Sequence, residues 1–237
     1  MKTLGSRGAR CSLLLGGIFL VSTFTGPVAN AQNQDAFSFS GSAALVTDYR
    51  FRGLSLSDKD AAIQGGFNVN HESGFYLSTW GSSISQFNGS ELELDIYGGY
   101  ATTIGDFSTN VGFLAYTYPG ATDNTDYYEV YGSVGGSLDA ISWTVGANYA
   151  FDQDGTGNQD NIYLYLSTST SIGNTPWSVS GNIAFEDGAF GNEKWDWLLG
   201  LNYSFQQFSL SVNYIDTANS GSSSGDAGVI GMLSASF

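Results

Sequence analysis

The stretch ISWTVGANYAF, residues 141–151, alternates strictly between apolar and small or polar side chains. The odd-numbered positions are apolar: Ile141, Trp143, Val145, Ala147, Tyr149 and Phe151. The even-numbered positions are small or polar, namely Ser142, Thr144, Gly146 and Asn148, and we call each such alternate set a parity. Alternation with a period of two places the two sets on opposite faces of a β-strand. This stretch therefore predicts a strand whose two faces meet different surroundings.

The same alternation recurs along most of the chain, in about twelve segments bounded by turn residues. The first is expected over residues 37–52 and the last over residues 229–237. The chain contains 32 glycines and 15% aromatic residues, which is too glycine-rich for helices and too aromatic for disorder. The composition and the pattern together indicate an all-β protein.

The connections between these segments alternate in length. Short turns are expected at residues 71–74, 103–106, 138–140, 170–176 and 204–207. Longer polar loops are expected at residues 53–60, 86–90, 119–125, 152–159, 187–193 and 216–225. Short turns at one end, longer loops at the other and an even number of strands are typical of bacterial outer-membrane barrels.

The apolar face distinguishes a membrane barrel from a soluble sandwich or a lipocalin-like barrel, which also use alternating strands. Across the chain this face carries almost no charge, and aromatic residues gather towards the strand ends. Lipid requires a closed sheet, because each backbone polar group must be paired internally. We therefore predict a transmembrane antiparallel β-barrel of about 12 strands over residues 32–237, in contact with outer-membrane lipid.

The first 31 residues are predicted to be a secretory signal peptide. Basic residues precede the apolar stretch 13–21, and an A-x-A cleavage site follows at residues 29–31. Cleavage would remove Lys2, Arg7, Arg10 and the only cysteine, Cys11, and would move the net charge from −15 to −18. Such an acidic chain is not expected to bind nucleic acid, and it has no thiol for a disulfide or a cysteine-based metal site.

Two stretches near the start of the barrel carry a family resemblance. LVTDYRFRGLSLSDKDAAIQGGFNVNHESGFYLSTWGSS (residues 45–83) and ELELDIYGGY (residues 91–100) are similar to the front of the TorF-like family of porins, the Gcw_chp domain. The resemblance implies an outer-membrane location and a porin-like role, and it supplies no catalytic residues.

Charged residues on the lumen parity are expected to gather near the outer mouth of the barrel. These candidate lumen and constriction residues are Asp48, Arg50, Arg52, Glu91, Glu93, Asp95, Glu129, Glu186 and Asp196. Carboxylates around a pore favour cations, and two arginines facing them would create a transverse field. The alternative interpretation is that the arginines only neutralise a crowded lumen.

The function predicted from these patterns is passive diffusion of small hydrophilic solutes with a cation preference, without a cofactor or catalytic residues. One alternative is a non-conducting barrel whose acidic loops, with Asp123, Asp126, Asp152, Asp154 and Asp160, bind a partner or divalent cations. A barrel hydrolase is disfavoured because the only histidine, His71, falls in a turn. Phe237 ends the last strand and resembles the signal recognised by the barrel-insertion machinery, and the sequence indicates no oligomeric state.

Overall fold

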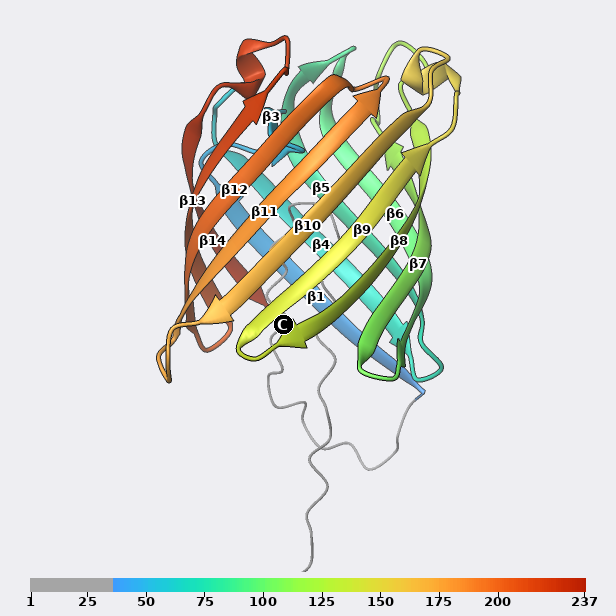
Figure 1. The fold of residues 1–237 in the computed structure, drawn as a ribbon. Coiled ribbons are helices and arrows are strands. Elements are labelled where there is room, and N and C mark those ends of the chain that lie inside the picture. The colour runs from blue at the N-terminus through green and yellow to red at the C-terminus, as the bar shows by residue number, and fades with distance from the viewer. Residues whose placement is uncertain (1–35) are drawn as a thin grey trace, which may run out of the picture.

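The computed structural model describes residues 36–237, which form a closed antiparallel barrel (Figure 1). Its wall is made of twelve strands: β1 (Phe37–Val46), β4 (Ala62–His71), β5 (Phe75–Phe87), β6 (Ser90–Ile104), β7 (Phe107–Thr117), β8 (Tyr127–Leu138), β9 (Ile141–Ala150), β10 (Asn161–Ser171), β11 (Trp177–Gly188), β12 (Gly191–Phe205), β13 (Phe208–Ala218) and β14 (Gly228–Ser236). Each strand pairs with its neighbours in the chain, and β1 closes the barrel by pairing with β14. The predicted signal peptide, residues 1–31, lies outside the described residues.

Alternation along the strands separates an apolar outer wall from a polar interior. On β9, Val145 is 51% exposed on the outside, whereas Thr144 and Asn148 are buried inside. The same holds around the barrel, where large apolar side chains such as Phe39, Ile63 and Leu199 are exposed. A continuous apolar wall of this kind is stable in lipid rather than in water. No helix among residues 36–237 is long and apolar enough to cross a membrane.

The connections follow the predicted alternation, with two differences. All five predicted short turns lie at one end of the barrel, and the 3-10 helices η1 (Asp154–Thr156) and η2 (Ser223–Gly225) lie in loops at the other end (Figure 1). The predicted loops 86–90 and 187–193 are instead tight turns, because β5 and β11 continue almost to the next strand. At the first of these turns Asn88 and Gly89 both have positive φ, as a two-residue hairpin requires.

The first strand differs most from its prediction over residues 37–52. β1 ends at Val46, and the following residues turn into the barrel instead of continuing up its wall. Within residues 47–61, which we call the inner segment, β2 (Arg50–Phe51) pairs with β3 (Leu54–Ser55) to form a small hairpin of its own. Figure 1 shows β3 within the outline of the barrel, close to the loop end.

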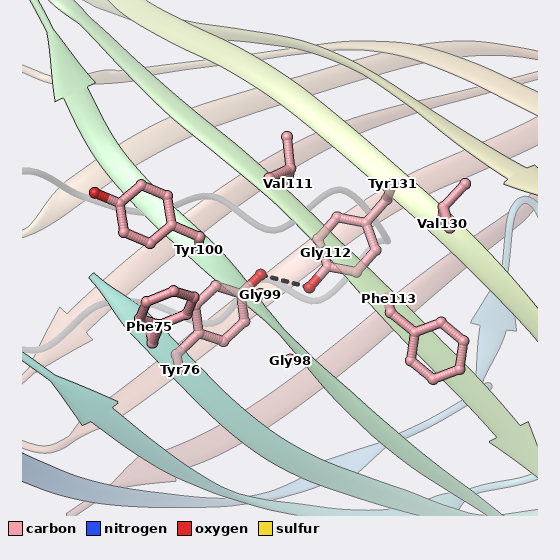
Figure 2. Close-up of a pocket in the computed structure, with 10 residues that line it drawn as sticks. All are labelled: Phe75, Tyr76, Gly98, Gly99, Tyr100, Val111, Gly112, Phe113, Val130 and Tyr131. Atoms are coloured by element: carbon pink, nitrogen blue, oxygen red, sulfur yellow. Dashed lines mark hydrogen bonds between the residues drawn. The ribbon is translucent and has the colours of Figure 1, made fainter. Parts of the chain in front are cut away.

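Below the inner segment, two tyrosines fill space left by glycines. Tyr76 of β5 and Tyr131 of β8 join through their hydroxyl groups across Gly99 and Gly112, and Tyr76 also donates to Asn110 Oδ1 at 2.9 Å (Figure 2). On the outside of the same wall a shallow apolar groove is lined by Phe75, Gly98, Tyr100, Val111, Phe113 and Val130. The glycines therefore let aromatic rings cross the lumen side of strands β6 and β7.

We expect Gly112→Ala to destabilise the barrel by about 1–3 kcal/mol, the usual cost of overpacking. A Cβ at Gly112 would overlap the Tyr131 ring and lie 2.6 Å from the carbonyl oxygen of Gly98. Gly132→Ala is the control, because a Cβ there comes no closer than 3.7 Å to Asn110 O. Urea unfolding of the lipid-refolded variants measures the effect, and equal midpoints for both variants would contradict this packing.

Candidate functional site

The inner segment places a tight hairpin tip against strands β12 and β13, on the inner side of the barrel wall. Arg52 and Gly53, with φ of 48° and 84°, form the two-residue turn between β2 and β3. A Cβ on Gly53 would overlap Thr217 and lie 2.8 Å from Asp196 Cβ, so only glycine fits at this approach. Lys194 of β12 donates from Nζ to the carbonyl oxygen of Arg52 at 2.6 Å. The tip is therefore fixed to the wall at β12 and β13.

Arg52 joins two carboxylates that come from different parts of the wall. Its Nη2 donates to both oxygens of Glu129 on β8, at 2.8 Å and 2.7 Å, and its Nη1 donates to Glu186 Oε1 on β11 at 2.8 Å. Lys194 Nζ lies 2.6 Å from Glu186 Oε2. All four side chains are at most 2% exposed. Two cations thus hold two carboxylates in a network that crosses the interior, which we call the Arg52 network.

Neutral groups complete the Arg52 network. Asn148 donates to Glu129 Oε2 at 3.1 Å, Asn161 donates to Glu186 Oε1 at 3.0 Å, and Tyr116 donates to Glu129 Oε2 at 3.3 Å. The guanidinium lies 4.5 Å from the centre of the Tyr163 ring, within the range of a cation–π contact. Buried ion pairs need such additional partners, because desolvation of each ion is costly.

Arg50 fixes the base of the hairpin. Its Nε donates to Asp48 Oδ2 at 2.6 Å, and Asp48 Oδ1 accepts from Ser55 Oγ at 2.6 Å. Its Nη1 donates to the carbonyl oxygens of Gly53, Ser224 and Asp226, at 3.0, 2.7 and 3.0 Å. Arg50 therefore links the inner segment to the loop that contains η2.

The remaining candidate carboxylates fall into two groups. Glu93, Asp95 and Asp196 are at most 1% exposed inside the barrel, as their strand parity predicts. Glu91 is exposed, close to the start of β6 and beside the irregular pairing of β5 with β6 between Ser83 and Phe87. Tyr49 donates to Glu93 Oε1 at 3.1 Å and Tyr163 donates to Asp196 Oδ1 at 3.2 Å.

The electrostatics of the inner segment keep Arg52 charged and Tyr49 neutral. Burial acts to lower the pKa of Arg52, but Glu129, Tyr116 and Glu186 raise it, and the net pKa is well above its usual value. Burial, followed by the negative charges of Glu93 and Asp95, raises the pKa of Tyr49 well above its usual value. Tyr49 is therefore a hydrogen-bond donor at neutral pH.

Sequence reasoning identified the arginines and their carboxylate partners, but it missed several members of the Arg52 network. Lys194, Asn148, Asn161, Tyr116 and Tyr163 were not candidates. A signal for Lys194 existed, because residues 32–237 contain only four lysines and arginines and a cation within a strand of lumen parity needs a carboxylate partner. Tyrosine and asparagine give no comparable signal, since they are common on every strand here.

The other predicted positions lie at the two ends of the barrel. His71 ends β4, and its Nδ1 lies 2.7 Å from Ser73 Oγ in an exposed turn. Phe237 pairs with Gly41 through its backbone, and its ring covers Gly41 of β1. Among residues 36–237, no group of three or more histidine, cysteine, aspartate or glutamate side chains is arranged to hold a metal ion, in the acidic loops or elsewhere.

Comparison with solved structures shows the fold of outer-membrane channels. The KdgM porin matches with a TM-score of 0.60 and 10% identity, over 84% of this chain and 98% of that chain. An outer membrane channel from Pseudomonas putida F1 matches with a TM-score of 0.51 and 10% identity, over 87% of this chain and 99% of that chain. The chain therefore has a porin-like barrel fold, and its apolar outer wall places it in the bacterial outer membrane.

Comparison with curated proteins found no match. A model of the family described as "Bacterial protein of unknown function (Gcw_chp)" matches residues 30–232. This confirms the predicted resemblance to the Gcw_chp domain, whereas the TorF designation is not part of the match and stays a prediction. Because the match covers most of the sequence, the chain belongs to the Gcw_chp family of bacterial proteins.

Proposed function

We propose that this barrel is a channel for passive diffusion of small hydrophilic solutes, with a preference for cations. The described interior contains six buried carboxylates, namely Asp48, Glu93, Asp95, Glu129, Glu186 and Asp196, and three buried cations, Arg50, Arg52 and Lys194. An interior with excess negative charge attracts cations and repels anions. This role requires no cofactor and no catalytic residue, and its partners are lipid and solutes.

The observation that carries the proposal is the inner segment held across the lumen by the Arg52 network. A chain segment anchored inside a barrel narrows the path at that level, here near the loop end. Towards the turn end, lumen residues such as Tyr97, Ser133 and Ser167 are only partly buried. We infer that the constriction lies at Arg52 and that the lumen widens below it.

The test is single-channel recording of the refolded barrel in a planar bilayer under a KCl gradient. We expect discrete openings and a reversal potential on the cation-selective side, because buried carboxylates outnumber buried cations in the described interior. Glu93→Gln and Asp196→Asn should each move the reversal potential towards zero. Exposed Glu91 supplies the matched control, Glu91→Gln, which removes one carboxylate that is not buried in the interior. An anion-selective potential would overturn the proposed preference.

A second candidate is a closed barrel that acts through its outer loops, and the tight packing around the inner segment favours it. Tyr49, Trp80, Ile84, Leu198 and Ile215 are all buried and form one apolar cluster with Val46, Ala62 and Ile230. Such packing can exclude water from this level. A barrel that inserts into the bilayer but shows no conductance in the same recording would support this second candidate. The role of Phe237 in recognition by the barrel-insertion machinery remains a prediction.

A further inference from the structure

Two buried carboxylates on β6 are not part of the Arg52 network. Glu93 and Asp95 lie two residues apart on the lumen face of one strand and are 0% and 1% exposed. Among residues 36–237, neither carboxylate forms a salt bridge, whereas Asp48, Glu129 and Glu186 each do. An isolated buried carboxylate costs several kcal/mol in real proteins, so a compensating partner is required.

The free oxygens of this pair are the second observation. The Tyr49 hydroxyl donates a hydrogen bond to Glu93 Oε1. Glu93 Oε2 and both carboxylate oxygens of Asp95 are buried and have no hydrogen-bond partner. Buried polar atoms without a partner are rare, and each one calls for an unseen ion, water or proton. Three free carboxylate oxygens from adjacent lumen positions provide the ligands that a hard cation prefers.

Two tyrosines outside the strands lie close enough to Glu93 and Asp95 for the carboxylate charges to influence their pKa values. Burial, followed by the charges of Glu93 and Asp95, raises the pKa of Tyr49 in the inner segment. Burial, followed by the same two charges, raises the pKa of Tyr118, which lies between β7 and β8. The three buried cations pair with other carboxylates: Arg50 with Asp48, Arg52 with Glu129 and Glu186, and Lys194 with Glu186. No described side chain therefore balances the charge of the Glu93 and Asp95 carboxylates.

We propose that Glu93 and Asp95 form a binding site for one divalent, oxygen-preferring cation, either Ca²⁺ or Mg²⁺. One divalent ion balances the charge of two carboxylates. Water and the Tyr49 hydroxyl oxygen complete the coordination, since Mg²⁺ in particular is often held by one or two carboxylates and keeps several waters. Because Tyr49 belongs to the inner segment, the ion would also stabilise that segment in its inward position. This site does not rest on the barrel being a channel.

The first test is thermal unfolding of the refolded barrel in detergent with EDTA, CaCl₂ or MgCl₂. A ligand that binds only the folded state raises the apparent stability with its concentration. We expect CaCl₂ or MgCl₂ to raise the melting temperature of the unmodified protein and of Glu91→Gln, but not of Glu93→Gln/Asp95→Asn. Glu91 is the matched control because it lies on the same strand with its side chain exposed.

A second measurement uses Tb³⁺, which substitutes for Ca²⁺ and is sensitised by a nearby indole. Trp80 of β5 pairs directly with Asp95, so bound Tb³⁺ should emit on tryptophan excitation and be displaced by Ca²⁺. Trp80→Phe should remove the emission while leaving the Ca²⁺ effect on melting. Equal Ca²⁺ stabilisation of the double variant would assign binding to the loops and overturn the site. No effect of either ion on the unmodified protein would overturn it in favour of a shared proton.

Discussion

Arg52→Ala will raise the single-channel conductance of the refolded barrel several-fold and will lower its stability by about 3–5 kcal/mol, the usual cost of breaking a buried ion pair from one side. The Arg52 guanidinium is the only described group that pairs with both Glu129 and Glu186. Without it, the two carboxylates stay buried and the positive charge between them is lost. Repulsion between them and the loss of the hairpin anchor should release the inner segment from the lumen. Planar-bilayer recording and urea unfolding measure the two effects.

Lys59→Ala is the matched control for Arg52→Ala. Lys59 belongs to the same inner segment and also pairs with a carboxylate, Asp226, at 3.4 Å. However, the side chains of this pair are 46% and 65% exposed, and exposed pairs contribute about 0–1 kcal/mol. We therefore expect unchanged conductance and nearly unchanged stability. If both variants conduct like the unmodified protein, the inner segment does not limit flow.

The same variant separates the two proposed functions. If the unmodified barrel conducts and Arg52→Ala conducts more, the inner segment sets the width of a channel. If the unmodified barrel is silent and Arg52→Ala conducts, the inner segment is a plug, and the outer loops are the place to search for a binding partner. A silent Arg52→Ala barrel that still inserts would contradict a release of the segment.

The barrel wall could be predicted from the sequence because lipid imposes a strict rule on each strand. One face of stretches such as residues 141–151 must be apolar, so the period of two is unbroken and the strand number can be counted. The structure confirms twelve strands and the predicted short turns. The same alternation predicted that Glu93, Glu129, Glu186 and Asp196 face the barrel interior. In the structure all four carboxylates are buried inside the barrel.

The inner segment could not be predicted in this way because its residues continue the alternation of β1. The parity of Tyr49 and Phe51 matches that of Phe37 and Leu45, although Tyr49 is buried and Leu45 faces outward. Length gives no clear signal, because β6 and β12 of the wall are each 15 residues long, almost as long as the predicted strand 37–52. Arg52 and Gly53 form the turn between β2 and β3 with positive φ, but Arg-Gly is not one of the dipeptides that mark a two-residue turn in a sequence.

Glu91 has the strand parity of Glu93 but is exposed, because it lies next to the turn at the loop end of β6. Parity predicts the face of a strand and does not predict where the strand leaves the buried part of the barrel. Lys194 was missed for a different reason. Its role depends on the position of the Arg52 carbonyl oxygen, which comes from a segment 142 residues earlier that folds inward. Contacts of this kind are set by the tertiary fold and leave no local pattern.

Val145→Arg will destabilise the barrel in lipid by about 2–4 kcal/mol, the cost of an arginine on the lipid face near the bilayer midplane. Val145 is 51% exposed on the outer wall, and it pairs with Val134 of β8 and Leu166 of β10 in the middle of β9. In a water-soluble barrel the same change would be nearly neutral, because exposed surface substitutions usually stay within about 0.5 kcal/mol. The experiment therefore tests the membrane environment of the wall directly.

Gln159→Arg provides the control, since it introduces the same side chain at an exposed position in the loop that follows β9. Val145→Leu separates the effect of charge from that of size. We expect both control variants to unfold in urea at nearly the same midpoint as the unmodified barrel in phosphatidylcholine vesicles. Only Val145→Arg should unfold earlier, because only there must a guanidinium leave water for hydrocarbon. Equal midpoints for Val145→Arg and Gln159→Arg would mean that the apolar outer wall of β9 does not face lipid.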